Sequence, residues 1–378
     1  MYEDTTKRRI VCSICVINSK MNAKHTTSIL KLLLIFTLTV IILVYAKSVL
    51  APIAIAAILS MLFVNLSAKL EKRNLPRWLT ALLSVFILLL AVAALFFILS
   101  WQVQSFAENV DSMKANMLKL LSRVQDWIHN QFGIDQEQQK DIAKEQVTPT
   151  PTNGMAGNFA GKLVGLLVDM VLVFVYTYLF LFYRSRIKSF LIRISAPNDQ
   201  ERALNIAHSS AKVATDYVGG LVKMIVVLWI LYGIGFSVVG VENAIFFAVL
   251  CGVLELVPFI GNLTGTSITI LGVLAQGGKG DMVVGVIIIY ALVQFVQTYL
   301  LEPLIVGNEV NINPLFTIIS LVAAEAIWGV PGMILAIPVT GIVKITCDSI
   351  PSLQPFGYLI GSDRKRRKSI WKRQGRPA

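Results

Sequence analysis

The sequence predicts an all-α, polytopic integral membrane protein, and its composition and the placement of its charges carry that prediction. Of its 378 residues, 55% are hydrophobic and only 15% are charged, whereas a soluble domain typically has about 25% charged residues. The charges are also clustered, since none lies between Lys47 and Lys69 or between Arg77 and Glu108. About 20 apolar residues suffice to cross the hydrocarbon core of a bilayer. A soluble enzyme, a secreted disulfide scaffold and a disordered chain are therefore excluded.

Apolar stretches with few or no charges predict about eight transmembrane helices. The first two are joined by a tight link, and a long polar insert follows the third. The sixth and eighth are longer than a crossing needs and contain Pro and Gly, so we expect broken, tilted or re-entrant helices in the C-terminal half. The predicted spans are residues 29–46, 49–67, 79–101, 163–183, 222–240, 244–274, 282–301 and 314–346.

Lys and Arg in the short loops predict the orientation of the spans. Basic residues precede the first span and follow the second and fourth, whereas residues 302–313 contain two Glu and no basic residue. Both termini are therefore expected in the cytoplasm, with the chain in a bacterial inner membrane. The expected segments are a cytoplasmic N-terminal segment (1–28), three spans (29–101), an extracytoplasmic amphipathic insert (102–160), the fourth span (161–183), a cytoplasmic helical segment (184–221), a C-terminal transmembrane core (222–346) and a cytoplasmic polybasic tail (347–378).

Two polar segments have helical patterns of their own. In the insert, apolar residues recur in alternating steps of four and three, which is a heptad seam. Such a helix packs against itself, a neighbouring subunit or the membrane surface, or covers its own chain as a lid, so a homo-oligomer formed through residues 106–127 is one alternative. In the cytoplasmic segment, Pro197-Asn198-Asp199 predicts the capped start of a second helix, roughly 199–217. The seam consists of Phe106, Val110, Met113, Met117, Leu120, Val124 and Trp127.

The net charge of +12 invites a nucleic-acid interpretation, but its placement argues against one. Eight basic residues lie within the last 15, beside the final span, where they set topology and attract anionic headgroups. We expect the lipid bilayer as a partner and no nucleic acid.

Cys12 and Cys15 form a CxxC motif. It has neither the second pair of a zinc site nor the βαβ context of a redox site, so no metal site is expected. Met21 begins a sequence suited to an inner-membrane protein, so translation from Met21 is an open alternative.

Catalytic and cofactor motifs are absent from the sequence. It contains no nucleophile elbow, no dinucleotide fingerprint and no Walker loop, so we expect neither an enzyme nor a cofactor, and no ATP-driven transport by this chain alone. Polar residues inside the spans remain, and these are costly and usually functional. Glu255 precedes Pro258, Gly261 and Asn262, a pattern typical of the broken helices that carry transporter sites. A structural Pro kink is the alternative.

The seventh and eighth spans add further candidates. Gln294, Gln297, Thr298 and Glu302 share one helix face, where they line a path or hold helices together. The eighth span has Glu325 and a Pro-x-x-Gly at 338–341 that echoes the one at 258–261. We expect helix breaks at both, which would supply a backbone site and a hinge. The full set of transport-pathway candidates is Glu255, Pro258, Gly261, Asn262, Gln294, Gln297, Thr298, Glu302, Pro303, Gly307, Pro314, Glu325, Gly329, Gly332, Pro338 and Gly341.

Four motifs make the sequence resemble the autoinducer-2 exporter family of bacterial, PerM-like permeases over about residues 29–361. They are Glu255–Gly261, Glu302–Gly307, Asn313-Pro314-Leu315 and Trp328–Pro338. The resemblance implies transport without ATP hydrolysis, with autoinducer-2 export for some members, which links them to quorum sensing, and sodium–proton antiport for others. It also implies oligomerisation.

The sequence therefore predicts a permease that exports a small organic solute or signal molecule. Two alternatives remain open. In a sodium- or lithium–proton antiporter, a buried glutamate such as Glu255 or Glu302 would exchange a proton for a cation. In a non-transporting membrane scaffold, the insert and the basic tail would dock partners.

Overall fold

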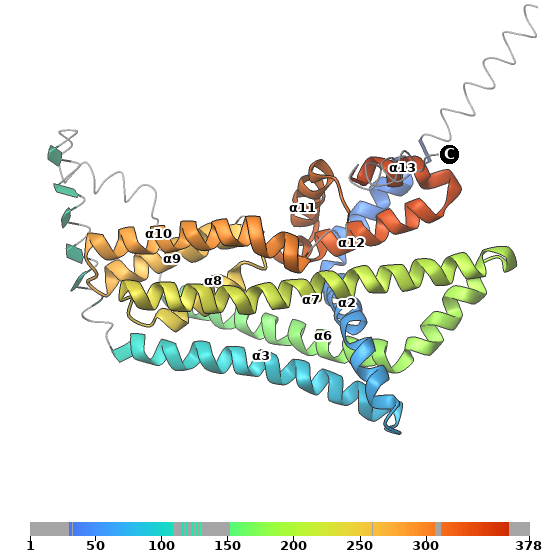
Figure 1. The fold of residues 1–378 in the computed structure, drawn as a ribbon, viewed down its shortest axis with the longest axis horizontal. Coiled ribbons are helices and arrows are strands. Elements are labelled where there is room, and N and C mark those ends of the chain that lie inside the picture. Colours follow the sequence, from blue (N-terminus) through green and yellow to red (C-terminus); the bar gives the residue numbers. More distant parts are fainter. Residues whose placement is uncertain are drawn as a thin grey trace, which may run out of the picture. The chain divides into compact units, whose positions relative to one another are not determined.

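The computed structural model describes residues 30–31, 33–108, 152–258, 260–306 and 311–362, with scattered positions between 113 and 130. Over these residues the chain is helical apart from turns and one isolated antiparallel bridge between Ile312 and Gly361. The predicted all-α fold is confirmed. The principal helices (Figure 1) are α2 (Lys47–Glu71), α3 (Arg77–Glu108), α6 (Thr152–Ile194), α7 (Gln200–Val239), α8 (Ala244–Leu254), α9 (Ile260–Ala275), α10 (Gly280–Val296), the π-helical η2 (Gln297–Val306), α11 (Pro314–Trp328), α12 (Val330–Ser349) and α13 (Gln354–Ile360), with short 3₁₀ turns η1 (Pro197–Asp199) and η3 (Pro351–Leu353).

Six helical stretches of the described chain are long and apolar enough to cross a membrane, which makes this a polytopic membrane protein. Two of the eight predicted spans, 29–46 and 244–274, correspond to shorter apolar helices, namely Leu33–Tyr45 for the first and α8 with α9 for the second. Large apolar side chains point outward on the long helices, as bilayer contact requires. The six stretches are Lys47–Glu71, Arg77–Trp101, Val164–Ile194, Pro197–Val239, Gly280–Ile305 and Val330–Ser349.

The chain forms two compact units, Met1–Ala51 and Pro52–Ala378. In the first unit, Leu33–Tyr45 is helical and its apolar side chains are largely exposed. The second unit holds most of α2 and every later helix. It also holds all the residues of the buried core, apart from Ala51, that are described below.

The predicted interruption of the sixth span is confirmed, and it takes the form of a helical hairpin. Gly265 of α9 lies against Cys251 of α8, and further along Gly272 lies against the ring of Phe247. Contacts in this order require the two helices to run antiparallel. The start of α8 and the end of α9 therefore lie on the same side of the unit. This is the geometry of a re-entrant hairpin.

The eighth predicted span is also a hairpin, but its turn is not where the sequence pattern placed a break. α11 and α12 meet at Gly329, whose φ of +66° and ψ of −139° suit a residue without a Cβ. The expected break at Pro338 and Gly341 is wrong, because α12 runs unbroken from Val330 to Ser349 with both residues buried. Neighbouring helices and local adjustments can satisfy the backbone groups that a proline frees inside a membrane helix.

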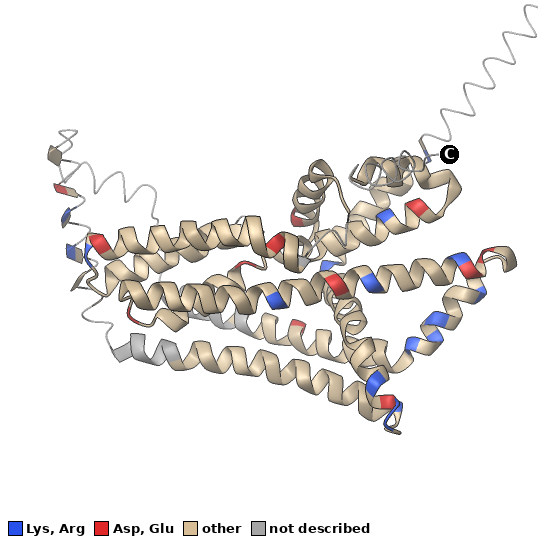
Figure 2. Ribbon diagram, in the orientation of Figure 1, with Lys and Arg blue, Asp and Glu red and all other residues tan. Residues whose placement is uncertain are grey.

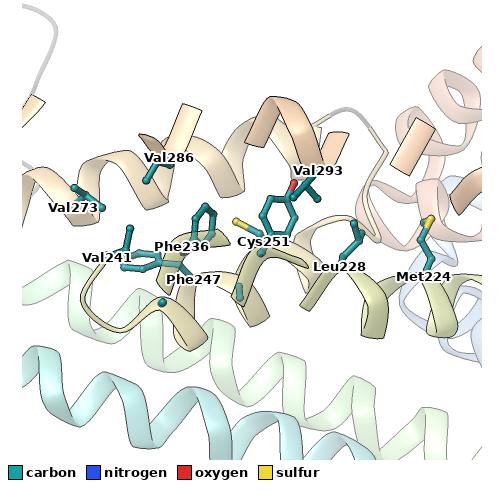
Figure 3. Packing of buried hydrophobic residues seen from close by; sticks show 12 residues of the cluster. Met224, Leu228, Phe236, Val241, Phe247, Cys251, Val273, Val286 and Val293 are labelled. Carbon is teal, nitrogen blue, oxygen red and sulfur yellow. The ribbon is translucent and has the colours of Figure 1, made fainter. Parts of the chain in front are cut away.

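α7 is the central helix of the second unit, because its side chains supply much of the core. Tyr232 and Phe236 are each 1% exposed and belong to one buried cluster with Phe247 of α8 and Val286 of α10. Figure 3 shows the side chains of Phe236, Phe247 and Val286 in this cluster. The predicted helix start near Asp199 is confirmed, since α7 begins at Gln200. Its predicted side-chain cap is wrong: Asp199 instead accepts a hydrogen bond from Arg202 at 2.7 Å. α7 is also longer than the expected polar helix and continues directly into the fifth span.

Polar contacts join α2, α3 and α6 at one end. Arg184 of α6 forms an ion pair with Glu71 of α2, and Arg77 of α3 donates a hydrogen bond to the hydroxyl of Ser185 at 3.1 Å. Lys and Arg gather at this end and along the last turns of α6 (Figure 2).

Of the heptad seam, the structure describes the side chain of Met113 alone; residues 1–28 and most of the basic tail lie outside the described residues.

Candidate functional site

The break between α8 and α9 places a carboxylate within the helix bundle. α8 ends at Leu254 because Pro258 has no N–H to continue the helix. The chain turns through local bonds, including one from the N–H of Val257 to the carbonyl of Leu254 at 2.9 Å. Glu255, the first residue after α8, is half-buried. A carboxylate in such a position requires a partner, because burying an unpaired charge is costly.

Gln297 supplies that partner from the next helix. Its Nε2 donates a short hydrogen bond to Oε1 of Glu255 at 2.6 Å. Gln297 is only 2% exposed and is the first residue of the π-helical η2. π-helical turns are rare and are found frequently at functional sites. The helix therefore changes its winding at the residue that binds Glu255.

The second polar atom of this amide is unsatisfied. Oε1 of Gln297 is buried and has no hydrogen-bond partner among the described residues. An unpaired buried acceptor of this kind costs about 1–3 kcal/mol. The amide oxygen and the adjacent Glu255 carboxylate are both acceptors. Together they suit a ligand that donates hydrogen bonds or carries positive charge.

A second polar chain links α9 to α10 beside this pair. Nδ2 of Asn262 donates to Oε1 of Gln294, and Nε2 of Gln294 lies 3.5 Å from Oγ1 of Thr298. Gln294 is half-buried, whereas Thr298 is exposed. The structure thus brings together most of the polar stripe that the sequence placed on one face of the seventh span.

Glu302 lies one turn further along η2. Its side chain is exposed, and it lies within electrostatic range of Glu255 and of the buried Tyr217 on α7. The two glutamates that the sequence singled out in the sixth and seventh spans are therefore parts of one polar region.

The tip of the α8–α9 hairpin touches the α11–α12 hairpin. Val257 packs against a small buried cluster of Leu321 on α11 with Met333 and Ala336 on α12. The two interrupted spans therefore meet next to Glu255. The second Pro-x-x-Gly, at 338–341, lies inside the unbroken α12 and not at the turn of this hairpin, so the echo of the two motifs does not mark two corresponding breaks.

Five of the remaining candidates, Pro314, Glu325, Gly332, Pro338 and Gly341, belong to α11 and α12. Glu325 is exposed on α11, and Pro314 follows Asn313, which caps α11 by accepting the N–H of Leu315 at 3.0 Å. Gly332 packs closely on the backbone of Ala324. Pro303 is exposed within η2, Pro338 and Gly341 are buried in α12, and Gly307 lies outside the described residues.

Sequence reasoning named Asn262 but missed the two buried threonines that continue its polar face along α9. Asn262, Thr266 and Thr269 recur at steps of four and three, so one face of α9 is polar. Thr269 is fully buried, and its hydroxyl lies 3.5 Å from the thiol of Cys251 on α8. The spacing of the three residues was a readable signal. The pairing with Cys251 was not, because it depends on the hairpin.

The fold and this site define a class of protein: an α-helical, multi-pass membrane protein with a polar, carboxylate-containing site where interrupted helices meet. That arrangement is typical of secondary transporters. The family comparison is specific: the model of the AI-2E family transporter matches residues 31–352. The chain belongs to this family of membrane transporters.

Relatives from distant bacteria share the designation "Putative transport protein". YueF of Bacillus subtilis is 24% identical over 350 residues, covering 87% of this chain and 93% of YueF. YhhT of Escherichia coli K12 is 23% identical, covering 78% of this chain and 82% of YhhT. MT0215 of Mycobacterium tuberculosis is 24% identical, covering 82% of this chain and 84% of MT0215. The similarity extends along most of each protein.

Proposed function

We propose that this transporter is a permease that exports a small, hydrogen-bonding organic solute without hydrolysing ATP. The observation that carries the proposal is the pair of adjacent acceptors, the Glu255 carboxylate and the buried, unpartnered Oε1 of Gln297. A solute rich in hydroxyl groups, such as a signal molecule of the autoinducer-2 type, would satisfy both. The amide groups of Asn262 and Gln294 would supply further contacts along the same path.

The source of energy follows from what the sequence lacks. It contains no Walker loop, so nucleotide binding by that route is not available to this chain. The solute would move down its own gradient or be coupled to an ion gradient. The placement of basic residues in the short loops supports an inner-membrane location with both termini in the cytoplasm.

A second function, exchange of Na⁺ or Li⁺ for protons, is favoured by one specific feature. Glu255 and Glu302 lie within electrostatic range of each other, so a cation bound near either carboxylate would reduce their mutual repulsion. In that mechanism Glu255 would hold the proton in one half of the cycle and contact the cation in the other.

The test uses everted inner-membrane vesicles that contain the full chain, with labelled autoinducer-2 as the first probe and pH-jump fluorescence with Na⁺, Li⁺ or K⁺ as the second. We expect solute uptake that falls at least about tenfold in Gln297→Leu, because a hydrogen bond to a charged group is worth about 1.5–3 kcal/mol. Thr264→Val, at an exposed position of α9, is the matched control and should transport normally.

Each result selects a different function. Solute uptake that is lost in Gln297→Leu and kept in Thr264→Val supports export. Cation-dependent proton movement that vanishes in Glu255→Gln supports antiport instead. Vesicles that respond to neither probe, although the protein is present and folded, would favour the scaffold alternative.

A further inference from the structure

The C-terminal part of α6 extends beyond what a membrane crossing requires. The apolar stretch Val164–Ile194 has 31 residues and is about 46 Å long at 1.5 Å per residue. The hydrocarbon core is about 30 Å thick, so about 20 residues from Val164 fill it and end near Tyr183. Residues 184–194 therefore lie at the level of the lipid headgroups or beyond.

This segment keeps an uncovered apolar stripe. Ile187, Phe190, Leu191 and Ile194 recur at steps of three, one and three, so they share one helix face. All four are exposed, Phe190 at 61% and Ile194 at 70%. Exposed apolar residues at helical spacing are typical of a helix that lies in the membrane interface.

The same segment is strongly basic. It contains Arg184, Arg186, Lys188 and Arg193 and no acidic residue. Arg184 is paired with Glu71, and the guanidinium of Arg186 lies 5.5 Å from the ring centre of Tyr183. Figure 2 shows these basic residues along the last turns of α6. The charge is thus complementary to an anionic surface.

An open depression of about 470 Å³ lies on this segment. Its lining combines two guanidinium groups, two hydroxyls and one aromatic ring, from Ser185, Arg186, Ser189, Phe190 and Arg193. Guanidinium groups bind phosphate through parallel hydrogen bonds, and serine hydroxyls can donate to its remaining oxygens. The exposed ring of Phe190 suits a ligand with an apolar part next to its phosphate.

We propose that this depression binds the phosphate of an anionic phospholipid from the adjacent leaflet, while the apolar stripe lies against the boundary between the headgroups and the acyl chains. The lipid is favoured over a soluble phosphate because the phosphate-binding groups and the uncovered apolar residues occupy the same eleven-residue segment (184–194). Bound lipid would fix the helix end from which the chain passes, through η1, into α7.

Native mass spectrometry of the purified full-length protein tests the proposal, with phosphatidylglycerol and phosphatidylcholine as probes. The protein should retain phosphatidylglycerol in preference to phosphatidylcholine. The double variant Arg186→Gln with Arg193→Gln should weaken that binding roughly thirtyfold, since each basic residue near an anionic surface contributes about a factor of five. The matched control removes two exposed charges from α7, Arg202→Gln with Lys212→Gln, and should bind as the wild type does.

Two further measurements separate a lipid from a soluble phosphate and a folding defect from a lost site. Inorganic phosphate and glycerol phosphate at millimolar concentration should leave phosphatidylglycerol bound; displacement by either would identify a soluble phosphate ligand and overturn the lipid assignment. Arg186→Lys with Arg193→Lys keeps the charge and should recover part of the affinity. Equal phosphatidylglycerol binding by wild type and the Gln double variant would refute the site.

Discussion

Thr80 and Thr177 are both fully buried threonines, but their hydroxyls have different partners. The hydroxyl of Thr80 accepts from Ser67 on α2 at 3.2 Å and donates to the carbonyl of Arg77 at 3.0 Å, with Glu71 3.5 Å away. Thr177 donates only to the carbonyl of Val173 in its own helix, at 2.7 Å. Thr80 therefore links two helices, whereas Thr177 satisfies itself locally.

This difference predicts unequal effects of the same substitution. Thr80→Val should lower the free energy of unfolding by about 1–3 kcal/mol, because the buried hydroxyl of Ser67 would lose its partner. Thr177→Val should cost less than about 1 kcal/mol. Thermal unfolding of the detergent-solubilised variants, followed by size-exclusion fluorescence, measures both. Equal losses would show that the α2–α3 contact contributes nothing beyond hydroxyl burial.

At the residue level, the sequence predicted the polar members of the site better than their relations. Glu255 and Gln297 were recognisable because a charge and an amide inside apolar spans are costly. Their direct bond was not, because it joins two helices 42 positions apart. The unpaired acceptor of Gln297 and the pairing of Cys251 with Thr269 depend in the same way on how the hairpin packs.

Among the elements, the α8–α9 hairpin packs closely at Gly272, where an added Cβ would force its neighbour to shift. A Cβ at Gly272 would overlap the ring of Phe247, whereas one at Gly165 of α6 has no atom within 4 Å. Gly272→Ala should therefore destabilise the protein by about 1–3 kcal/mol, because core atoms must shift. Gly165→Ala should be neutral or stabilising by up to about 1 kcal/mol, through helix propensity.

The melting temperatures of these two glycine variants test whether α8 and α9 pack closely at Gly272. A loss in Gly272→Ala and none in Gly165→Ala would support the packed hairpin. If both variants melt with the wild type, α8 and α9 are not in contact at this level, and the hairpin assignment is wrong.

Hydropathy predicted where the apolar helices lie, but not how the interrupted ones turn. Apolar length located 244–274 and 314–346, and the Pro and Gly content indicated that both are broken. A local pattern cannot distinguish a kinked crossing from a hairpin, because that choice is made by contacts such as Gly265 with Cys251. The expected helix break at Pro338 is wrong for the same reason, because its surroundings in α12 tolerate the missing N–H.

At the scale of the whole molecule, the two hairpins of the second unit contact each other near Glu255. Val257, at the tip of α8–α9 and two residues after Glu255, packs against Leu321 and Met333 of α11–α12. A transporter must expose its site alternately to the two sides, and in many families one group of helices moves against another to do so. The contact between the tip of α8–α9 and the helices α11 and α12 is small and apolar, so separating it would break no hydrogen bond or ion pair that the structure assigns to it.

Linking the two hairpins should therefore stop transport without unfolding the protein. In a background with Cys12, Cys15, Cys251 and Cys347 replaced by alanine, Val257→Cys with Met333→Cys can be joined by a short bifunctional thiol reagent. We expect flux of the transported probe in everted vesicles to fall to the background level after linking. The same reagent should leave either single-cysteine variant active, and a reducible linker should restore flux on reduction. Full transport by the linked protein would show that the two hairpins move as one body, and would place the alternating step elsewhere in the bundle.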